Sequence, residues 1–127
     1  MLKVGLLGAG RIGQVHAAVV AAHEGSKLAA VSDVCAPAAE ELAAKYHAQM
    51  RSSDEIIADD TIDAVLIATS TDTHSDLIEA ATQAGKAVMC EKPVDLSLER
   101  ARACFEVVSA TGRPAVSYTH LTLPTKA

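Results

Sequence analysis

The chain has 127 residues, enough for one domain with a hydrophobic core of its own. Half of the residues are hydrophobic but only 2% are aromatic, so the core must consist of Ala, Val, Leu and Ile, as in helices packed closely on a sheet. The formal net charge of −5, with Lys and Arg scattered singly along the chain, argues against a nucleic-acid partner.

The cysteines and the hydropathy of the chain indicate the cellular environment of the protein. Cys35, Cys90 and Cys104 are an odd number at wide spacings, which indicates reduced thiols rather than a disulfide framework or a metal site. No apolar run approaches the length that spans a bilayer, and Met1 is not followed by the charged and apolar regions of a signal peptide. We therefore expect a cytoplasmic protein with neither a membrane partner nor a bound metal.

Short apolar runs alternate with longer amphipathic segments along the chain. In chain order they predict a strand at 3–7, a helix at 12–22, a strand at 28–31, a helix at 37–46, a helical turn at 53–57, a strand at 63–68, a helix at 73–84, a strand at 86–90 and a helix at 97–111. Gly85 and Gly112 stand where glycines commonly end helices. This alternation predicts an α/β fold with a doubly wound parallel sheet joined by right-handed crossovers.

The last residues, 116–127, break this pattern. They contain no acidic residue and one of the two tyrosines of the chain. Ala115 to Tyr118 could form the next strand, but the segment resembles the translated end of a transposon-type sequencing adaptor. We therefore predict one domain over residues 1–115 and a non-native tail over residues 116–127.

Residues 8–13 (GAGRIG) follow the first predicted strand and open the first predicted helix. In a dinucleotide-binding turn, Gly8 makes the bend, Gly10 lets a diphosphate approach the backbone, and Gly13 lets the helix pack closely on the strand. The unpaired N–H groups and the dipole of the helix start would then bind the phosphates. This motif alone is weak evidence, but here a strand, a helix and an acidic residue accompany it.

The acidic residue is Asp33, twenty residues after Gly13 at the end of the second predicted strand. Its carboxylate could accept hydrogen bonds from both hydroxyls of an adenosine ribose and would repel the 2′-phosphate of NADP. Residues 34–36 supply no Lys or Arg to neutralise such a phosphate. The pattern predicts NAD rather than NADP, while a methyltransferase that binds S-adenosylmethionine through a similar loop stays open at this point.

Two later strands also end in polar residues, at the edge where open parallel sheets bind their ligands. Ser70, Thr71 and His74 follow the strand at 63–68 and could contact a cofactor. The alternative is that Thr71, Asp72 or Thr73 caps the next helix and that His74 is an ordinary helix-start residue. Glu91 and Lys92 follow the strand at 86–90. Lys92 would lie close to a nicotinamide and is a candidate acid/base group, with a solvated surface residue as the alternative.

Taken together, the turn at 8–13, the segment 32–34 (SDV), the segment 68–74 (ATSTDTH) and the segment 90–93 (CEKP) resemble the glucose-fructose oxidoreductase, inositol dehydrogenase and rhizopine catabolism (Gfo/Idh/MocA) family, and most of all its inositol dehydrogenases. The likeness covers residues 2 to about 115, so this stretch would be an NAD-binding Rossmann domain. Glu-Lys-Pro has no counterpart in methyltransferases. The resemblance implies NAD contacts from Gly8, Gly10, Arg11, Ile12, Asp33, Ser70, Thr71, His74 and Glu91, and it places Lys92 beside the nicotinamide and the substrate carbinol as the catalytic residue.

The family implies an NAD-dependent dehydrogenase acting on CH–OH groups of a polyol or sugar, with myo-inositol oxidised to the 2-keto product as the first expectation. Its carboxyl-terminal α/β substrate domain, which completes the site and carries most of the oligomer interface, is absent here. We expect a homo-oligomeric full-length parent and a fragment that binds NAD weakly without turnover. The alternatives are a family member with another sugar or dihydrodiol substrate and a non-catalytic NAD-binding regulatory or structural protein, which would have no need of Lys92.

Overall fold

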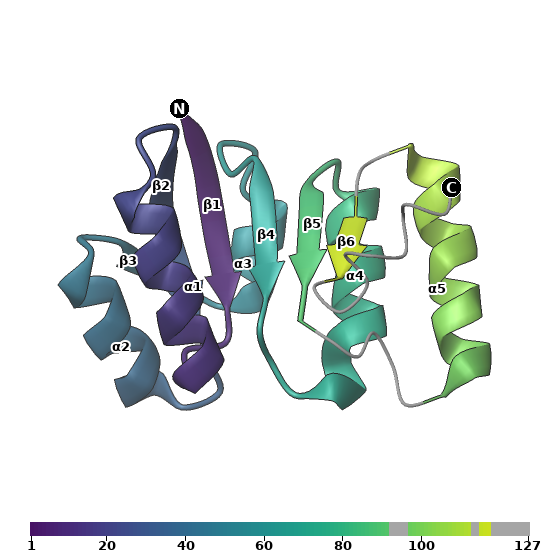
Figure 1. The fold of residues 1–127 in the computed structure, drawn as a ribbon, viewed down its shortest axis with the longest axis horizontal. Coiled ribbons are helices and arrows are strands. Elements are labelled where there is room, and N and C mark those ends of the chain that lie inside the picture. Colours follow the sequence, from purple (N-terminus) through teal and green to yellow (C-terminus); the bar gives the residue numbers. More distant parts are fainter. Residues whose placement is uncertain (92–96, 113–114, 118–127) are drawn as a thin grey trace.

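The computed structural model describes residues 1–91 and 97–112, and the backbone of residues 115–117. Six strands form one sheet in the order β3-β2-β1-β4-β5-β6, and all neighbouring strands are parallel (Figure 1). The strands are β1 (Leu2–Leu7), β2 (Ser26–Ser32), β3 (Gln49–Met50), β4 (Ala64–Ile67), β5 (Ala87–Cys90) and β6 (Ala115–Ser117). The predicted doubly wound α/β fold is confirmed.

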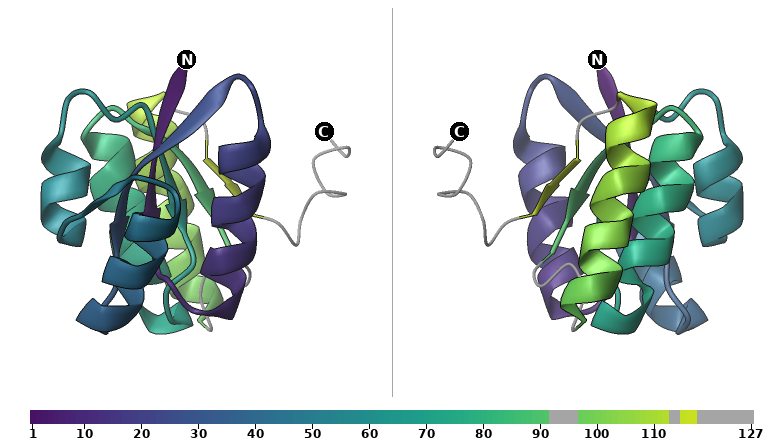
Figure 2. Two further views of the ribbon diagram at one scale, coloured as in Figure 1. Left: turned by 90° about the vertical axis from the view of Figure 1, so that its left-hand side faces the viewer. Right: turned by 90° about the vertical axis from the view of Figure 1, so that its right-hand side faces the viewer.

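Helices cover both faces of the sheet. They are α1 (Arg11–Ala22), α2 (Ala36–Lys45), α3 (Ser53–Ala58), α4 (His74–Gln83) and α5 (Leu98–Thr111), with a short 3-10 helix η1 (Thr71–Thr73) before α4. Figure 2 shows α1 on one side of the sheet and α4 and α5 on the other. Successive side chains of β1 point to opposite faces of the sheet, which explains why helices pack on both faces. Val4 and Leu6 pack with residues of α1 and α2, whereas Leu7 packs with α3, α4 and α5.

The predicted elements are present, with most of their ends shifted by one or two residues, and three further differences are informative. The helical turn at 53–57 is a full helix, α3, which begins with a capping box between Ser52 and Glu55. Strand β3 was not predicted, because two exposed residues carry no periodicity. Lys86 stands outside β5 instead of in it: its side chain is buried, and Nζ donates to the carbonyl oxygens of Asp59 at 2.7 Å and Ile62 at 2.9 Å.

The segment for which two interpretations were open begins with a strand. Ala115 pairs with Val88, and Ser117 pairs with Cys90, which makes β6 the outermost strand beside β5. Residues 118–127 lie outside the described residues. The assignment of residues 116–127 to a non-native tail therefore stays a prediction.

The structure describes the environment of all three cysteines. All three thiols are free of disulfides; Cys35 is exposed, whereas Cys90 and Cys104 are buried. Burial raises the pKa of Cys90 to about 12, so this thiol stays protonated at neutral pH. Within the described ranges, none of the helices combines the length and the apolar character needed to cross a membrane.

Candidate functional site

The candidate site lies at the carboxyl ends of the parallel strands, where the backbone pairing continues into the loops. Gly8, directly after β1, donates its N–H to the carbonyl oxygen of Ser32 at 2.7 Å. Ala68, directly after β4, donates to the carbonyl oxygen of Leu7 at 2.7 Å. These bonds hold the loops after β1, β2 and β4 side by side at one edge of the sheet.

The glycine turn after β1 has the geometry expected of a dinucleotide-binding turn. Gly8 has a φ of +107°, and a Cβ built on it would lie 2.3 Å from the carbonyl oxygen of Ala68. A Cβ on Gly13 would lie 2.0 Å from the carbonyl oxygen of Gly8. Both positions therefore require glycine for reasons inside the chain.

Gly10 is different, because a Cβ at this position would meet no atom of the chain within 4 Å. Its φ of −76° and ψ of −163° are accessible to any residue. Neither packing nor backbone conformation calls for glycine here. The missing side chain leaves room at the surface for an external group to approach the backbone, as the diphosphate of a dinucleotide does.

The first turn of α1, which follows Gly10, presents backbone donors to this space. Its N-cap makes no side-chain capping bond, and its first turn holds no acidic residue. By contrast, α3 is capped by Ser52 and Glu55. The first N–H groups of a helix lack intrahelical partners, and they lie at the positive end of its dipole. Arg11 and Ile12, both exposed, therefore stand where an anionic group would be stabilised.

Asp33 connects the glycine turn to the start of α2. Its Oδ2 accepts a hydrogen bond from the N–H of Ala9 at 2.6 Å, and its Oδ1 accepts one from the N–H of Cys35 at 2.7 Å. A carboxylate oxygen can accept more than one bond, so a ribose hydroxyl can be added at each oxygen. The side chain is thus fixed in orientation before any ligand arrives.

A cavity of about 390 Å³ opens beside Asp33. It is lined by Ser32, Asp33, Val34, Ala36, Met50, Arg51, Ser52, Ser53, Glu55 and Thr69. These residues come from the ends of β2, β3 and β4 and from the starts of α2 and α3. The predicted ribose-binding residue, Asp33, thus lies at the wall of a cavity.

The polar residues after β4 divide into exposed and buried ones. Ser70 is exposed and Thr71 is partly exposed, so both can meet a ligand. His74 is only 1% exposed, and its Nε2 lies 3.0 Å from the carbonyl oxygen of Thr69. This position suits a residue that fixes the loop. A direct contact between His74 and NAD stays a prediction. At the start of the same helix, the N-cap residue Thr73 makes no side-chain capping bond.

An ion pair that sequence reasoning missed joins α1 to the end of β5. His16 Nε2 lies 2.5 Å from Glu91 Oε2, and both side chains are largely buried. His16 is three residues after Gly13, on the same face of the helix, and a single histidine in a helix carries no local signal of a partner so far along the chain. Lys92, the predicted catalytic residue, directly follows Glu91 but lies outside the described residues.

The described residues offer no cluster of three or more His, Cys, Asp or Glu side chains that could hold a metal ion. The donors at this edge are instead backbone amides, hydroxyls and carboxylates. Such a set fits a dinucleotide, because amides bind its diphosphate and a carboxylate binds its ribose.

Comparison with known proteins also indicates a dinucleotide-binding domain. The family described as "Oxidoreductase family, NAD-binding Rossmann fold" matches residues 2–120. An inositol 2-dehydrogenase of Rhizobium meliloti is 54% identical over 110 residues, which are 87% of this chain and 33% of that protein. The scyllo-inositol 2-dehydrogenase (NAD(+)) of Bacillus subtilis is 40% identical, again over 87% of this chain and 33% of that protein.

A solved structure is similar over nearly the whole chain. The crystal structure of a putative myo-inositol dehydrogenase from Sinorhizobium meliloti superposes with a TM-score of 0.92 at 50% identity. The match covers 94% of this chain and 37% of that one. The chain spans about a third of the length of the curated relatives it matches.

Proposed function

Because the chain belongs to the Gfo/Idh/MocA oxidoreductase family, whose shared domain is an NAD-binding Rossmann fold, we propose that it is the NAD-binding part of a dehydrogenase that oxidises a secondary hydroxyl of a polyol or sugar. The expected substrate is myo-inositol, oxidised to its 2-keto product, since similar proteins carry inositol dehydrogenase names. The observation that carries this proposal is the open backbone at Gly10, followed by a helix start that has neither a side-chain cap nor an acidic residue.

Different residues of the chain are proposed to bind different parts of the cofactor. The backbone at Gly10, Arg11 and Ile12 is proposed to hold the diphosphate, with Gly8 and Gly13 shaping the turn. Asp33 is proposed to accept hydrogen bonds from the adenosine ribose, which favours NAD over NADP.

Ser70 and Thr71 are proposed to border the cofactor from the loop after β4. His74 is proposed to support them by holding the carbonyl oxygen of Thr69. If the ring also touches the cofactor, the loop must first open, because His74 is buried.

The reactive end is proposed to lie after β5. When bound, NAD⁺ supplies a hydride acceptor for the carbinol carbon of the substrate. Lys92 is proposed to take part in moving the hydroxyl proton, and Glu91 to contact the cofactor. The His16–Glu91 ion pair supports this arrangement, because it anchors the residue just before Lys92 to the helix that would carry the diphosphate.

Residues outside this chain are proposed to complete the enzyme. The relatives are about three times as long as the matched segment, so substrate choice and the remaining proton-relay groups are assigned to the polypeptide that this chain does not include. The same applies to the contacts of a homo-oligomer. Residues 1–115 are proposed as the NAD-binding domain, and residues 116–127 as a tail that takes no part in function.

Thermal unfolding of the purified chain tests the cofactor assignment. At equal concentrations, NAD should raise the melting temperature more than NADP or S-adenosylmethionine, because stabilisation follows ligand concentration relative to Kd. A larger shift with S-adenosylmethionine, or no shift with millimolar NAD, would refute the proposal.

A further inference from the structure

The cavity beside Asp33 has a charge pattern that bears on the 2′ position of a bound adenosine. Among the described residues that line it, Asp33 and Glu55 are acidic and Arg51 is basic. Hydrogen bonds from the backbone N–H and the side chain of Ser52 lower the pKa of Glu55, so this carboxylate stays ionised at neutral pH. The lining therefore includes two carboxylates and a single basic residue, whose side chain ends at Asp59.

Arg51 is well placed to compensate them. Its backbone N–H donates to the carbonyl oxygen of Val31 at 3.0 Å, so it continues β3 beside the end of β2. Neighbouring parallel strands lie about 4.8 Å apart. The long side chain of Arg51 therefore starts one strand away from Asp33, within reach of a phosphate on the adenosine ribose.

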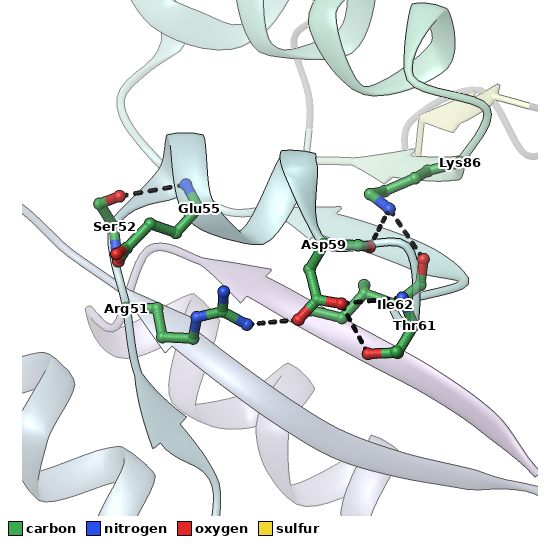
Figure 3. A network of polar contacts seen from close by, with 7 residues as sticks. All are labelled: Arg51, Ser52, Glu55, Asp59, Thr61, Ile62 and Lys86. Carbon is green, nitrogen blue, oxygen red and sulfur yellow. Dashed lines mark hydrogen bonds and ion pairs between the residues drawn. The ribbon is translucent and has the colours of Figure 1, made fainter.

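The guanidinium of Arg51 is nevertheless held elsewhere. Its Nη1 is ion-paired with Oδ2 of Asp59, which follows the last turn of α3, and Figure 3 shows the side chain extended toward that carboxylate. The other oxygen, Oδ1, accepts hydrogen bonds from the hydroxyl of Thr61 at 2.6 Å and from its N–H at 2.8 Å. The bonds from Thr61, followed by the one from Arg51, hold the pKa of Asp59 far below its usual range. Asp59 is thus a fixed, ionised anchor.

We propose that the Arg51–Asp59 ion pair is a determinant of cofactor specificity: by keeping the guanidinium at Asp59, it withholds from the cavity the cation that a 2′-phosphate would need. Asp33 repels such a phosphate, and Asp59 removes the group that could offset this repulsion. The inference rests on the proposed function, in which the adenosine ribose lies at Asp33. It adds a second element of selection further along the chain, at Arg51 and Asp59.

Asp59→Asn is the substitution that releases Arg51 while keeping the bonds from Thr61. The side-chain oxygen of Asn can still accept both bonds from Thr61, while its amide group replaces the oxygen that binds Arg51. The double variant Asp59→Asn/Arg51→Gln removes the released cation as well. Thr61→Val is the matched control, because it deletes the hydroxyl bond to Asp59 but leaves the ion pair in place.

Calorimetric titration of the full chain with NADP and NAD gives the readout. In Asp59→Asn, the affinity for NADP should rise about tenfold, the low end of what a charge-assisted hydrogen bond contributes, whereas the affinity for NAD should change by less than about twofold. The double variant should lose this gain, and Thr61→Val should show none. If Asp59→Asn does not fold by circular dichroism, Asp59→Ser tests the same release.

The outcomes separate the two proposals. If the unsubstituted chain binds NAD but Asp59→Asn binds NADP no better, or if the gain survives Arg51→Gln, the specificity role of the ion pair is refuted. If the unsubstituted chain does not bind NAD at all, the proposed function itself fails.

Discussion

At the scale of single residues, the three glycines of the first turn have three different reasons to be glycine. Gly8 combines a positive φ with a contact to Ala68, and Gly13 lies against the carbonyl of Gly8. Gly10 meets neither condition, because its backbone is ordinary and the space before it is open. Its lack of a side chain fits the proposed approach of a diphosphate to the backbone.

Gly10→Val therefore separates folding from binding. The unfolding free energy should fall by about 1 kcal/mol or less, because no atom obstructs the new side chain and the main cost is that valine is a poorer helix N-cap than glycine. The affinity for NAD should fall at least about tenfold, equivalent to about 1.4 kcal/mol, because the valine would occupy the place of the diphosphate.

Denaturant titration and calorimetry measure the two quantities. Gly25→Ala is the matched control, since Gly25 is an exposed glycine just before β2, at the opposite edge of the sheet. It should leave NAD binding unchanged. Undiminished affinity in Gly10→Val would place the diphosphate elsewhere.

At the scale of elements, the loop between α3 and β4 is fastened to the start of β5 by a buried cation. Lys86 is 3% exposed, and Nζ bonds the backbone carbonyls of Asp59 and Ile62 (Figure 3). The same loop includes the carboxylate that binds Arg51. One lysine therefore holds the far end of α3 at the sheet while the capping box fixes its near end.

Lys86→Met keeps the length of the side chain and removes its donors. The buried carbonyl of Ile62 would lose its bond from Lys86, and the partly buried carbonyl of Asp59 would keep only the bond from the N–H of Ile62, so the protein should be destabilised by about 2 kcal/mol. Urea unfolding should show a lower midpoint with an unchanged slope. Lys27→Met, on the exposed side of β2, is the control and should cost no more than about 0.5 kcal/mol. Equal stability of the two variants would show that the buried bonds contribute little.

At the scale of the whole molecule, every candidate site residue that the structure describes comes from one edge of one sheet. Doubly wound sheets bind ligands at the carboxyl ends of their strands, next to the point where the strand order reverses, which here lies between β1 and β4. This edge can hold a cofactor. A substrate needs a second wall, which we assign to residues outside the chain.

The isolated chain should accordingly bind NAD without catalysis. Absorbance of NADH at 340 nm should not rise above the protein-free blank when myo-inositol and NAD⁺ are added. A longer parent protein that includes the same 115 residues is the positive control. Inositol-dependent NADH formation by the isolated chain would contradict the assignment of the missing groups to another domain.

The sequence by itself determined the layered fold, because apolar runs of strand length alternate with amphipathic segments of helix length. It also located the glycine turn, Asp33 and the polar loop after β4, since local chemistry marks each of them. Four short motifs carried the family resemblance, which the match over residues 2–120 confirms. These features can be predicted from the sequence because each depends on residues that are neighbours along the chain.

Only the tertiary structure decided the contacts between distant segments. The His16–Glu91 ion pair joins residues 75 positions apart, and Lys86 reaches back 27 residues to Asp59. Strand β3 exists because β2 offers it an edge, although its own two residues carry no pattern. The structure also shows that His74 is buried, which its position in the sequence does not indicate. Long-range pairing depends on how elements pack in three dimensions, and a residue's type and local spacing do not contain that information.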